Sequence, residues 1–337
     1  MLGIRKLALG ALTATGLALG GLGAGSAAAQ SPSTSVDLAL PGADERLLIG
    51  GGLPFGLYFP MAGTLCRLLE TGAAPQPCAV ASLADSAAAI ESLTSGEMPF
   101  AIVQSDWLHH AVQGTSRYQE TGPSEDLRAV AAFYTEAFTI FVKATGPIAS
   151  LADLEDKRVS VGPAGSYRGI MADVALDAAG LDRDDLAESS GEPVVGAIER
   201  LCDGRTDAVV VMAVHPAELL TSAGRRCGIA PLSFTDGEVS EMLGALLGYA
   251  EVIIPAKTYP GQTVPVRTVG LRPVLATTVD ADPAIVGALT SAIARGLDRL
   301  NASHPAFATI QIDDLATAAS FAPLHPAAAQ ALGVAGQ

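Results

Sequence analysis

The sequence contains few aromatic and few basic side chains. Only 5% of its 337 residues are Phe, Trp or Tyr, so a surface on which bases or sugar rings stack is not expected. Lys and Arg number 20 against 35 Asp and Glu, which gives a formal charge of −15. This shortage of cations argues against binding to nucleic acid or to anionic lipid, because both need clustered Lys and Arg.

Long hydrophobic runs are also scarce, although hydrophobic residues make up 49% of the chain. The exception is the N-terminus, where Arg5 and Lys6 precede the apolar stretch 7–19 and the small residues Ala27-Ala28-Ala29. This three-part pattern is typical of a secretory signal peptide. We therefore expect a signal peptide over 1–29, a flexible leader over 30–43 and a periplasmic mature protein. The alternative interpretation is an uncleaved membrane anchor.

Cysteine is rare, and its use fits an exported protein. The chain has four cysteines, an even number, and an oxidising compartment favours disulfide bonds. Four cysteines allow three pairings, and proximity in sequence favours Cys66 with Cys78 and Cys202 with Cys227. Zinc sites prefer CxxC clusters with histidine, and that spacing does not occur. No metal site or cofactor is therefore predicted.

Short apolar stretches alternate with glycine-rich loops and helical patterns. The expected strands are 46–50, 79–83, 100–103, 139–143, 158–161 and 208–214, and the expected helices are 58–70, 86–95 and 169–179. Repeated strand, loop and helix units are typical of an α/β fold with parallel strands. Two glycine-rich loops, near residues 50 and 162, each precede a helix. Because helix N-termini favour anions, two such loops predict a cleft that holds a small anion or zwitterion.

A series of short motifs runs along the chain. The first is the glycine loop at 49–60, which carries Tyr58 and leads into the first helix. Further motifs lie at 95–97, 101–107, 151–154, 157–162, 202–208, 214–216, 254–262, 304–307 and 322–326. In their order and spacing, these motifs resemble those of the TAXI family, the solute-binding subunits of one class of TRAP transporters, over about residues 47–330.

The resemblance implies a type II periplasmic binding fold with two Rossmann-like lobes around a ligand cleft. Lobe 1 would comprise 44–140 plus 252–337, and lobe 2 would comprise 141–251. It also implies a monomeric, non-enzymatic protein that captures a small carboxylate or amino acid, such as glutamate or 2-oxoglutarate. Its partners would be TRAP membrane subunits that import the solute with sodium. The alternatives are a ligand sensor, or a secreted enzyme using Ser166 and His215, on the same fold.

The predicted ligand site combines the resemblance with the polar residues that end strands and begin helices. The candidates are Gly51, Gly52, Tyr58, Asp85, Ser86, Gln104, Ser105, Asp106, Gly165, Ser166, Tyr167, Arg168 and His215. Asp85 stands in a stretch that reads Thr-Gly-Gly-Ser in many family members, and there it could cap a helix and repel an anion. Arg168 adds a cation suited to carboxylates. Asp85 and Arg168 together fit a ligand with one carboxylate and an amino or hydroxyl group.

Overall fold

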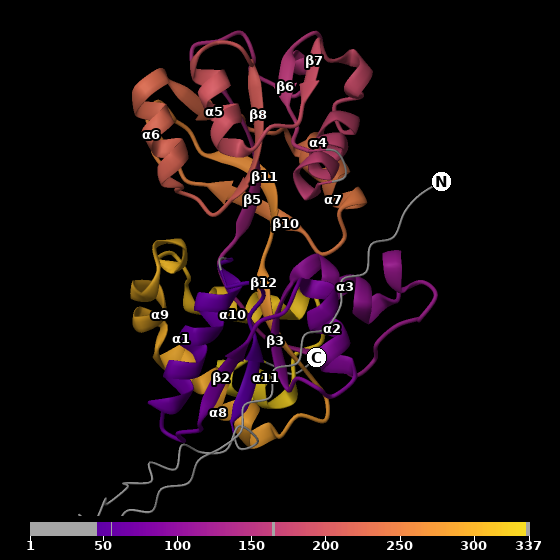
Figure 1. Ribbon diagram of the computed structural model, residues 1–337, viewed down its shortest axis with the longest axis vertical. Helices are drawn as coiled ribbons and strands as arrows, with labels where there is room; N and C mark the ends of the chain where they lie inside the picture. Colours follow the sequence, from indigo (N-terminus) through magenta and orange to yellow (C-terminus); the bar gives the residue numbers. More distant parts are fainter. Residues whose placement is uncertain (1–45, 55, 164–165, 335–337) are drawn as a thin grey trace, which may run out of the picture. The chain divides into compact units, whose positions relative to one another are not determined.

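The computed structural model describes residues 46–54, 56–163 and 166–334, and its strands form two sheets (Figure 1). The first sheet has the order β2-β1-β3-β12-β4. Its strands are β1 (Leu47–Gly50), β2 (Cys78–Ala81), β3 (Phe100–Gln104), β4 (Leu127–Ala132) and β12 (Pro273–Thr278). Strand β1 runs parallel to β2 and β3, whereas β12 is antiparallel to β3 and β4. In Figure 1 the orange β12 accordingly lies beside β3, although the two are far apart in sequence.

The second sheet has the order β10-β11-β5-β8-β6-β7, and β9 pairs with β5. Its strands are β5 (Glu136–Lys143), β6 (Arg158–Ser160), β7 (Glu188–Ser190), β8 (Ala208–Ala213), β9 (Ile229–Pro231), β10 (Ala250–Ile254) and β11 (Val266–Leu271). The chain thus passes to this sheet after Ala132 and leaves it after Leu271. The predicted lobe boundaries near 140 and 252 stay a prediction, because sheet membership alone does not define which parts move together.

Helices pack on both sheets. They are α1 (Tyr58–Glu70), α2 (Ser86–Thr94), α3 (Ser105–Gln113), α4 (Tyr167–Asp177), α5 (Val194–Cys202), α6 (Glu218–Cys227), α7 (Asp236–Ala245), α8 (Pro283–Arg295), α9 (Leu297–Ser303), α10 (Ile312–Ala316) and α11 (Pro326–Leu332). Short 3₁₀ turns lie at Ser116–Tyr118, Ala152–Leu154, Arg183–Asp185, Pro305–Phe307 and Thr317–Ser320. The residues predicted as the first two helices, 58–70 and 86–95, form α1 and α2 almost to the residue. No helix in the described ranges is both long and apolar enough to cross a membrane.

Four apolar clusters form the main core, and each is assembled around a sheet. In the first, Met61 and Leu65 of α1 pack with Leu289 and Ile293 of α8, and all four side chains are fully buried. The spacing of four residues places each pair on one face of its helix. Clusters on α2 and α3, on α4 and α7, and on α5 and α6 complete the arrangement. Helix burial therefore fixes where the strand ends of each sheet lie.

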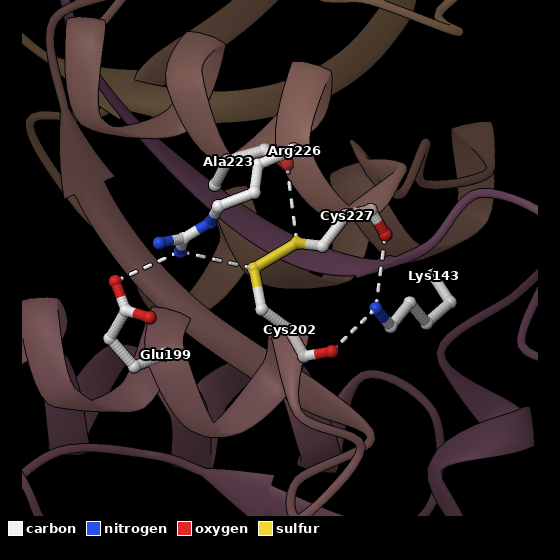
Figure 2. The surroundings of a disulfide bond; sticks show 6 residues. All are labelled: Lys143, Glu199, Cys202, Ala223, Arg226 and Cys227. Carbon is white, nitrogen blue, oxygen red and sulfur yellow. Dashed lines mark hydrogen bonds and ion pairs between the residues drawn. A yellow bond between two sulfur atoms is a disulfide. The ribbon is translucent and has the colours of Figure 1, made fainter.

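Both predicted disulfides are confirmed. Cys66 in α1 is bonded to Cys78 at the start of β2, and Cys202 at the end of α5 is bonded to Cys227 at the end of α6. Figure 2 shows the second bond, where the Lys143 ammonium group donates 3.0 Å hydrogen bonds to the carbonyl oxygens of Cys202 and Cys227. The predicted signal peptide and leader lie outside the described residues.

Candidate functional site

A cavity of about 450 Å³ is lined by residues from both sheets, and we call it the Tyr58 cavity. Residues that precede or belong to the first sheet's helices and strands supply one wall: Gly52, Leu53, Gly56, Leu57, Tyr58, Ala84, Asp85, Ser86, Ile102 and Gln104. Glu136 of β5, Met212 and Ala213 of β8, and Val214 supply the other. The volume suits a small metabolite. Five of the predicted site residues, Gly52, Tyr58, Asp85, Ser86 and Gln104, therefore share one cavity.

The glycine loop reaches the cavity because its backbone lies close to α1. Gly52 has a φ of +67°, a conformation that L side chains rarely adopt. A Cβ atom at Gly51 would lie 2.9 Å from the side chains of both Ala62 and Val80. Gly51 therefore serves packing of the loop against α1 and β2, while Gly52 lines the cavity.

The start of α1 offers unpaired backbone donors to the cavity. Within the part of the chain that the structure describes, no side chain caps this helix, and its first turn has no acidic residue. The first N–H groups of a helix have no partner within the helix and carry partial positive charge. Leu57, the N-cap residue, and Tyr58, the first residue of α1, both line the cavity. This end of the cavity is suited to a carboxylate or another polar acceptor.

The start of α2 differs, because an N–H group of its first turn already has a side-chain partner. The Asp85 carboxylate accepts a 2.9 Å hydrogen bond from the backbone N–H of Ala88, as the sequence predicted for a capping Asp. The Ser86 hydroxyl accepts a 3.1 Å hydrogen bond from the backbone N–H of Gln104. Asp85 thus places a carboxylate in the cavity, where it would repel the carboxylate of a ligand.

Tyr58 and Glu136 lie in a group of buried titratable side chains. Burial, followed by the charge of Glu136, raises the pKa of Tyr58 well above its ordinary value. Burial, followed by the charge of Asp106, raises the pKa of Glu136 to about 7. The hydroxyls of Tyr58 and Tyr249 are buried and have no hydrogen-bond partner within the described residues, whereas the Tyr134 hydroxyl is hydrogen-bonded to Glu136.

Charge in this region is of one sign. Among the described residues, the side chains that line the Tyr58 cavity include two carboxylates, Asp85 and Glu136, and no Lys, Arg or His. Burial raises the pKa of Asp106 to about 6. Neither Glu136 nor Asp106 forms an ion pair with any described residue. The cavity therefore holds negative charge without a protein counter-ion.

Three predicted residues at the starts of α3 and α4 lie outside the Tyr58 cavity. Ser105 is fully buried and bonds to the backbone of Gly248 and Arg272, so it has no exposed surface for a ligand. Asp106 and Tyr167 instead line a separate cavity of about 270 Å³. The structure therefore separates Ser105, Asp106 and Tyr167 from the residues that line the Tyr58 cavity.

The second glycine-rich loop is arranged differently from the expectation. The Ser166 hydroxyl caps α4 by accepting a 3.1 Å hydrogen bond from the backbone N–H of Gly169. Arg168 is only 8% exposed and donates to the Glu192 carbonyl oxygen at 2.8 Å and to the Ser160 hydroxyl at 3.2 Å. These bonds hold the Arg168 side chain against Glu192 and Ser160, and it does not line the Tyr58 cavity. Gly165 lies outside the described residues.

His215 is part of another hydrogen-bonded group. Its Nδ1 atom lies 2.5 Å from the Tyr259 hydroxyl, and it lines a third cavity of about 400 Å³. Burial lowers the pKa of His215 to about 4, which keeps the ring neutral at pH 7. Ser166 and His215 each hydrogen-bond to other groups, and no hydrogen bond joins the two within the described residues. Within the described ranges, no group of three or more His, Cys, Asp or Glu is placed to hold a metal ion.

Sequence reasoning missed the second wall of the Tyr58 cavity. Glu136 had a detectable signal, because it is the only charged residue between 129 and 142 in an otherwise largely apolar stretch. A lone carboxylate in such a stretch is costly unless it serves a site. Met212 and Val214 had no such signal, since apolar residues at a strand end are ordinary.

The whole described fold corresponds to one sequence family. Residues 49–336 match the sequence profile of the NMT1-like family. The chain belongs to the NMT1-like family. The solved structures similar to this NMT1-like protein include a TctC solute binding protein from Polaromonas, with 16% identity and a TM-score of 0.54. That alignment covers 86% of this chain and 96% of the other.

A second similar structure is the periplasmic aliphatic sulphonate binding protein SsuA from Escherichia coli. It has 18% identity and a TM-score of 0.46, over 86% of this chain and 78% of that one. The predicted fold class, the two-lobed α/β architecture of periplasmic binding proteins, is confirmed for this NMT1-like protein.

Proposed function

We propose that this protein is an exported solute-binding protein that captures a small organic molecule in the Tyr58 cavity for uptake. The observation that carries the proposal is a cavity of about 450 Å³ lined from both sheets and containing the uncapped start of α1. Membership of the NMT1-like family and likeness to the TctC solute binding protein support it. In this proposal the protein releases its ligand unchanged and performs no catalysis.

The structure supports separate roles for the two walls. The start of α1 supplies N–H donors for a polar acceptor of the ligand. Met212, Ala213 and Val214 supply an apolar surface from the second sheet. Because the walls belong to different sheets, a ligand that touches both would hold the sheets together. A hinge movement between the two expected lobes, 44–140 plus 252–337 and 141–251, would open the site.

The first experiment looks for a retained ligand. Native mass spectrometry of the protein from its own periplasm should show an added mass of a small molecule that is lost on denaturation. Tyr58→Ala should remove the added mass, whereas Tyr118→Ala, a change outside the Tyr58 cavity, should keep it. Retention of the same mass by Tyr58→Ala would place the ligand elsewhere.

The resemblance to the TAXI family supports a finer proposal. In it, a monomeric periplasmic protein with a cleaved 1–29 signal peptide delivers an amino acid or organic acid to TRAP membrane subunits. Deletion of the gene should abolish sodium-dependent uptake of the retained molecule, and adjacent genes should encode multi-span membrane proteins. Uptake that needs ATP and not a sodium gradient would contradict the TRAP assignment while leaving solute binding intact.

A further inference from the structure

We propose that the solute held in the Tyr58 cavity carries a positively charged amino group, which is bound by the Glu136 carboxylate beside the Tyr58 hydroxyl. This inference rests on the proposed function and narrows its ligand class. It favours an amine or amino acid over a dicarboxylate or oxo acid, because the cavity walls contain carboxylates and no basic side chain.

The described residues around Glu136 supply no free cation, so a cationic ligand group would be its ion-pair partner. Tyr58 of α1, Asp106 of α3, Tyr134 and Tyr249 all influence Glu136 or are influenced by it, and none of them is basic. The nearby Arg272 of the connection between β11 and β12 is already paired with Asp314 at 2.9 Å. His215, at the end of β8, stays neutral at pH 7. Asp85 adds a second carboxylate to the same cavity.

The Tyr58 hydroxyl is buried beside Glu136 and has no hydrogen-bond partner within the described residues. The Tyr134 hydroxyl is hydrogen-bonded to Glu136 and lines the neighbouring cavity of about 400 Å³. A buried hydroxyl without a partner is costly, and a ligand that supplies one removes that cost. An ammonium group provides several N–H donors for hydroxyl and carboxylate oxygens, and aromatic rings attract cations. The carboxylate of an amino acid would then lie toward the start of α1.

The inference has a proton signature. In the empty cavity, burial and Asp106 raise the pKa of Glu136 to about 7, so part of the protein carries a proton there at pH 6. A bound cation favours the charged carboxylate, so binding should release that proton. Affinity for an amine should therefore rise with pH, by up to about tenfold per unit below pH 7, and level off above it. An anionic ligand should show the opposite trend.

The test uses matched probes that differ at one group. The wild-type chain is titrated calorimetrically with alanine, leucine and glutamate and with their 2-oxo acids, and with butylamine as an amine without carboxylate. We expect binding by at least one amino acid or amine, at least tenfold weaker binding by its oxo partner, and proton release at pH 6. Glu136→Gln should weaken the amine by about tenfold or more, whereas Glu241→Gln on the surface of α7 should not.

Each other outcome has a separate meaning. Equal or tighter binding of the oxo acids, or affinity that falls as pH rises, would overturn the amine assignment and leave the solute-binding proposal standing. If no probe binds and no small molecule is retained from the periplasm, the solute-binding proposal fails and this inference fails with it. Because the probe comparison uses the unmodified chain, it stands even if Glu136→Gln does not fold.

Discussion

The Ser105 hydroxyl at the start of α3 donates a 2.7 Å hydrogen bond to the carbonyl oxygen of Gly248, just before β10. It also accepts a 3.0 Å bond from the backbone N–H of Arg272, between β11 and β12. Gly248 has a φ of +83°, and a Cβ atom there would lie 2.4 Å from the Asp106 Cα atom. Ser105, directly after β3 of the first sheet, is therefore bonded to the segment before β10 and to the segment after β11, and both of those strands belong to the second sheet.

We predict that Ser105→Ala lowers the free energy of unfolding by about 1–3 kcal/mol, because two backbone groups lose a buried partner. Ser240→Ala, an exposed change on α7, serves as the matched control and should stay within about 0.5 kcal/mol. Urea unfolding followed by circular dichroism measures both. Equal stability of the two variants would show that the Ser105 bonds contribute nothing measurable.

Asp85 combines helix capping with charge in the cavity, and two substitutions separate these roles. Asp85→Ala should cost about 1 kcal/mol of stability, since the cap to Ala88 is lost. Asp85→Asn should keep stability, because Asn is an equally good cap, yet weaken binding of a cationic ligand. Asp282→Ala, which removes the matching cap of α8, should lower stability without changing affinity. If Asp282→Ala also lost affinity, the weaker binding of the Asp85 variants would be explained by the loss of a helix cap and not by the charge of Asp85.

Glu136 makes the empty protein less stable as pH rises. Its pKa lies at about 7 in the folded state, above the ordinary value of 4.5, so the folded state binds more protons between these limits. Stability is then greatest below about pH 4.5 and falls as pH rises to 7, by on the order of 3 kcal/mol. Asp106, whose pKa burial raises to about 6, acts in the same direction. Unfolding in urea at pH 5 and pH 8 should show a smaller difference for Glu136→Gln than for the wild type; equal differences would refute this assignment.

Substitution of Arg168 distinguishes a ligand-binding role from a structural role. The sequence predicts that Arg168→Ala weakens ligand binding at least tenfold, whereas its burial and its bonds to Glu192 and Ser160 favour a structural role. We expect a loss of stability of about 2 kcal/mol with unchanged affinity for the retained ligand. Arg225→Ala, which removes an exposed pair with Glu218, should cost less than about 1 kcal/mol. Weakened binding with an unchanged free energy of unfolding would show that Arg168 contributes to the ligand site.

Local signals predicted much of the fold. The apolar spacing at 58–70 and the glycine at 96 gave α1 and the end of α2, and the continuous apolar run at 208–214 gave β8, because these features depend on neighbours in sequence. The antiparallel insertion of β12 between β3 and β4 was not predicted. Its pairing joins Leu275 to Ile102 and Ala131, and no local pattern encodes partners so distant in sequence.

The site was predicted only on the side where sequence motifs lie close together. Tyr58, Asp85 and Gln104 end strands or begin helices of the first sheet, and that sheet's parallel strands bring them to one edge. Glu136 comes from β5 of the second sheet, so its place depends on how two sheets meet. The orientation of Arg168 has a similar limit, because a helix position does not reveal whether a long side chain turns inward to a carbonyl such as that of Glu192.

The position of β12 sets the order in which the first sheet can form during synthesis. Strand β4 ends at Ala132, yet its neighbour in the sheet is β12, which begins at Pro273. A ribosome therefore finishes every strand of the second sheet before β4 can gain that partner. Until then β4 and one edge of β3 keep open backbone groups, which are the groups that a chaperone or another unfinished chain would bind. Truncation before residue 273 should accordingly leave an aggregation-prone chain rather than a smaller folded protein.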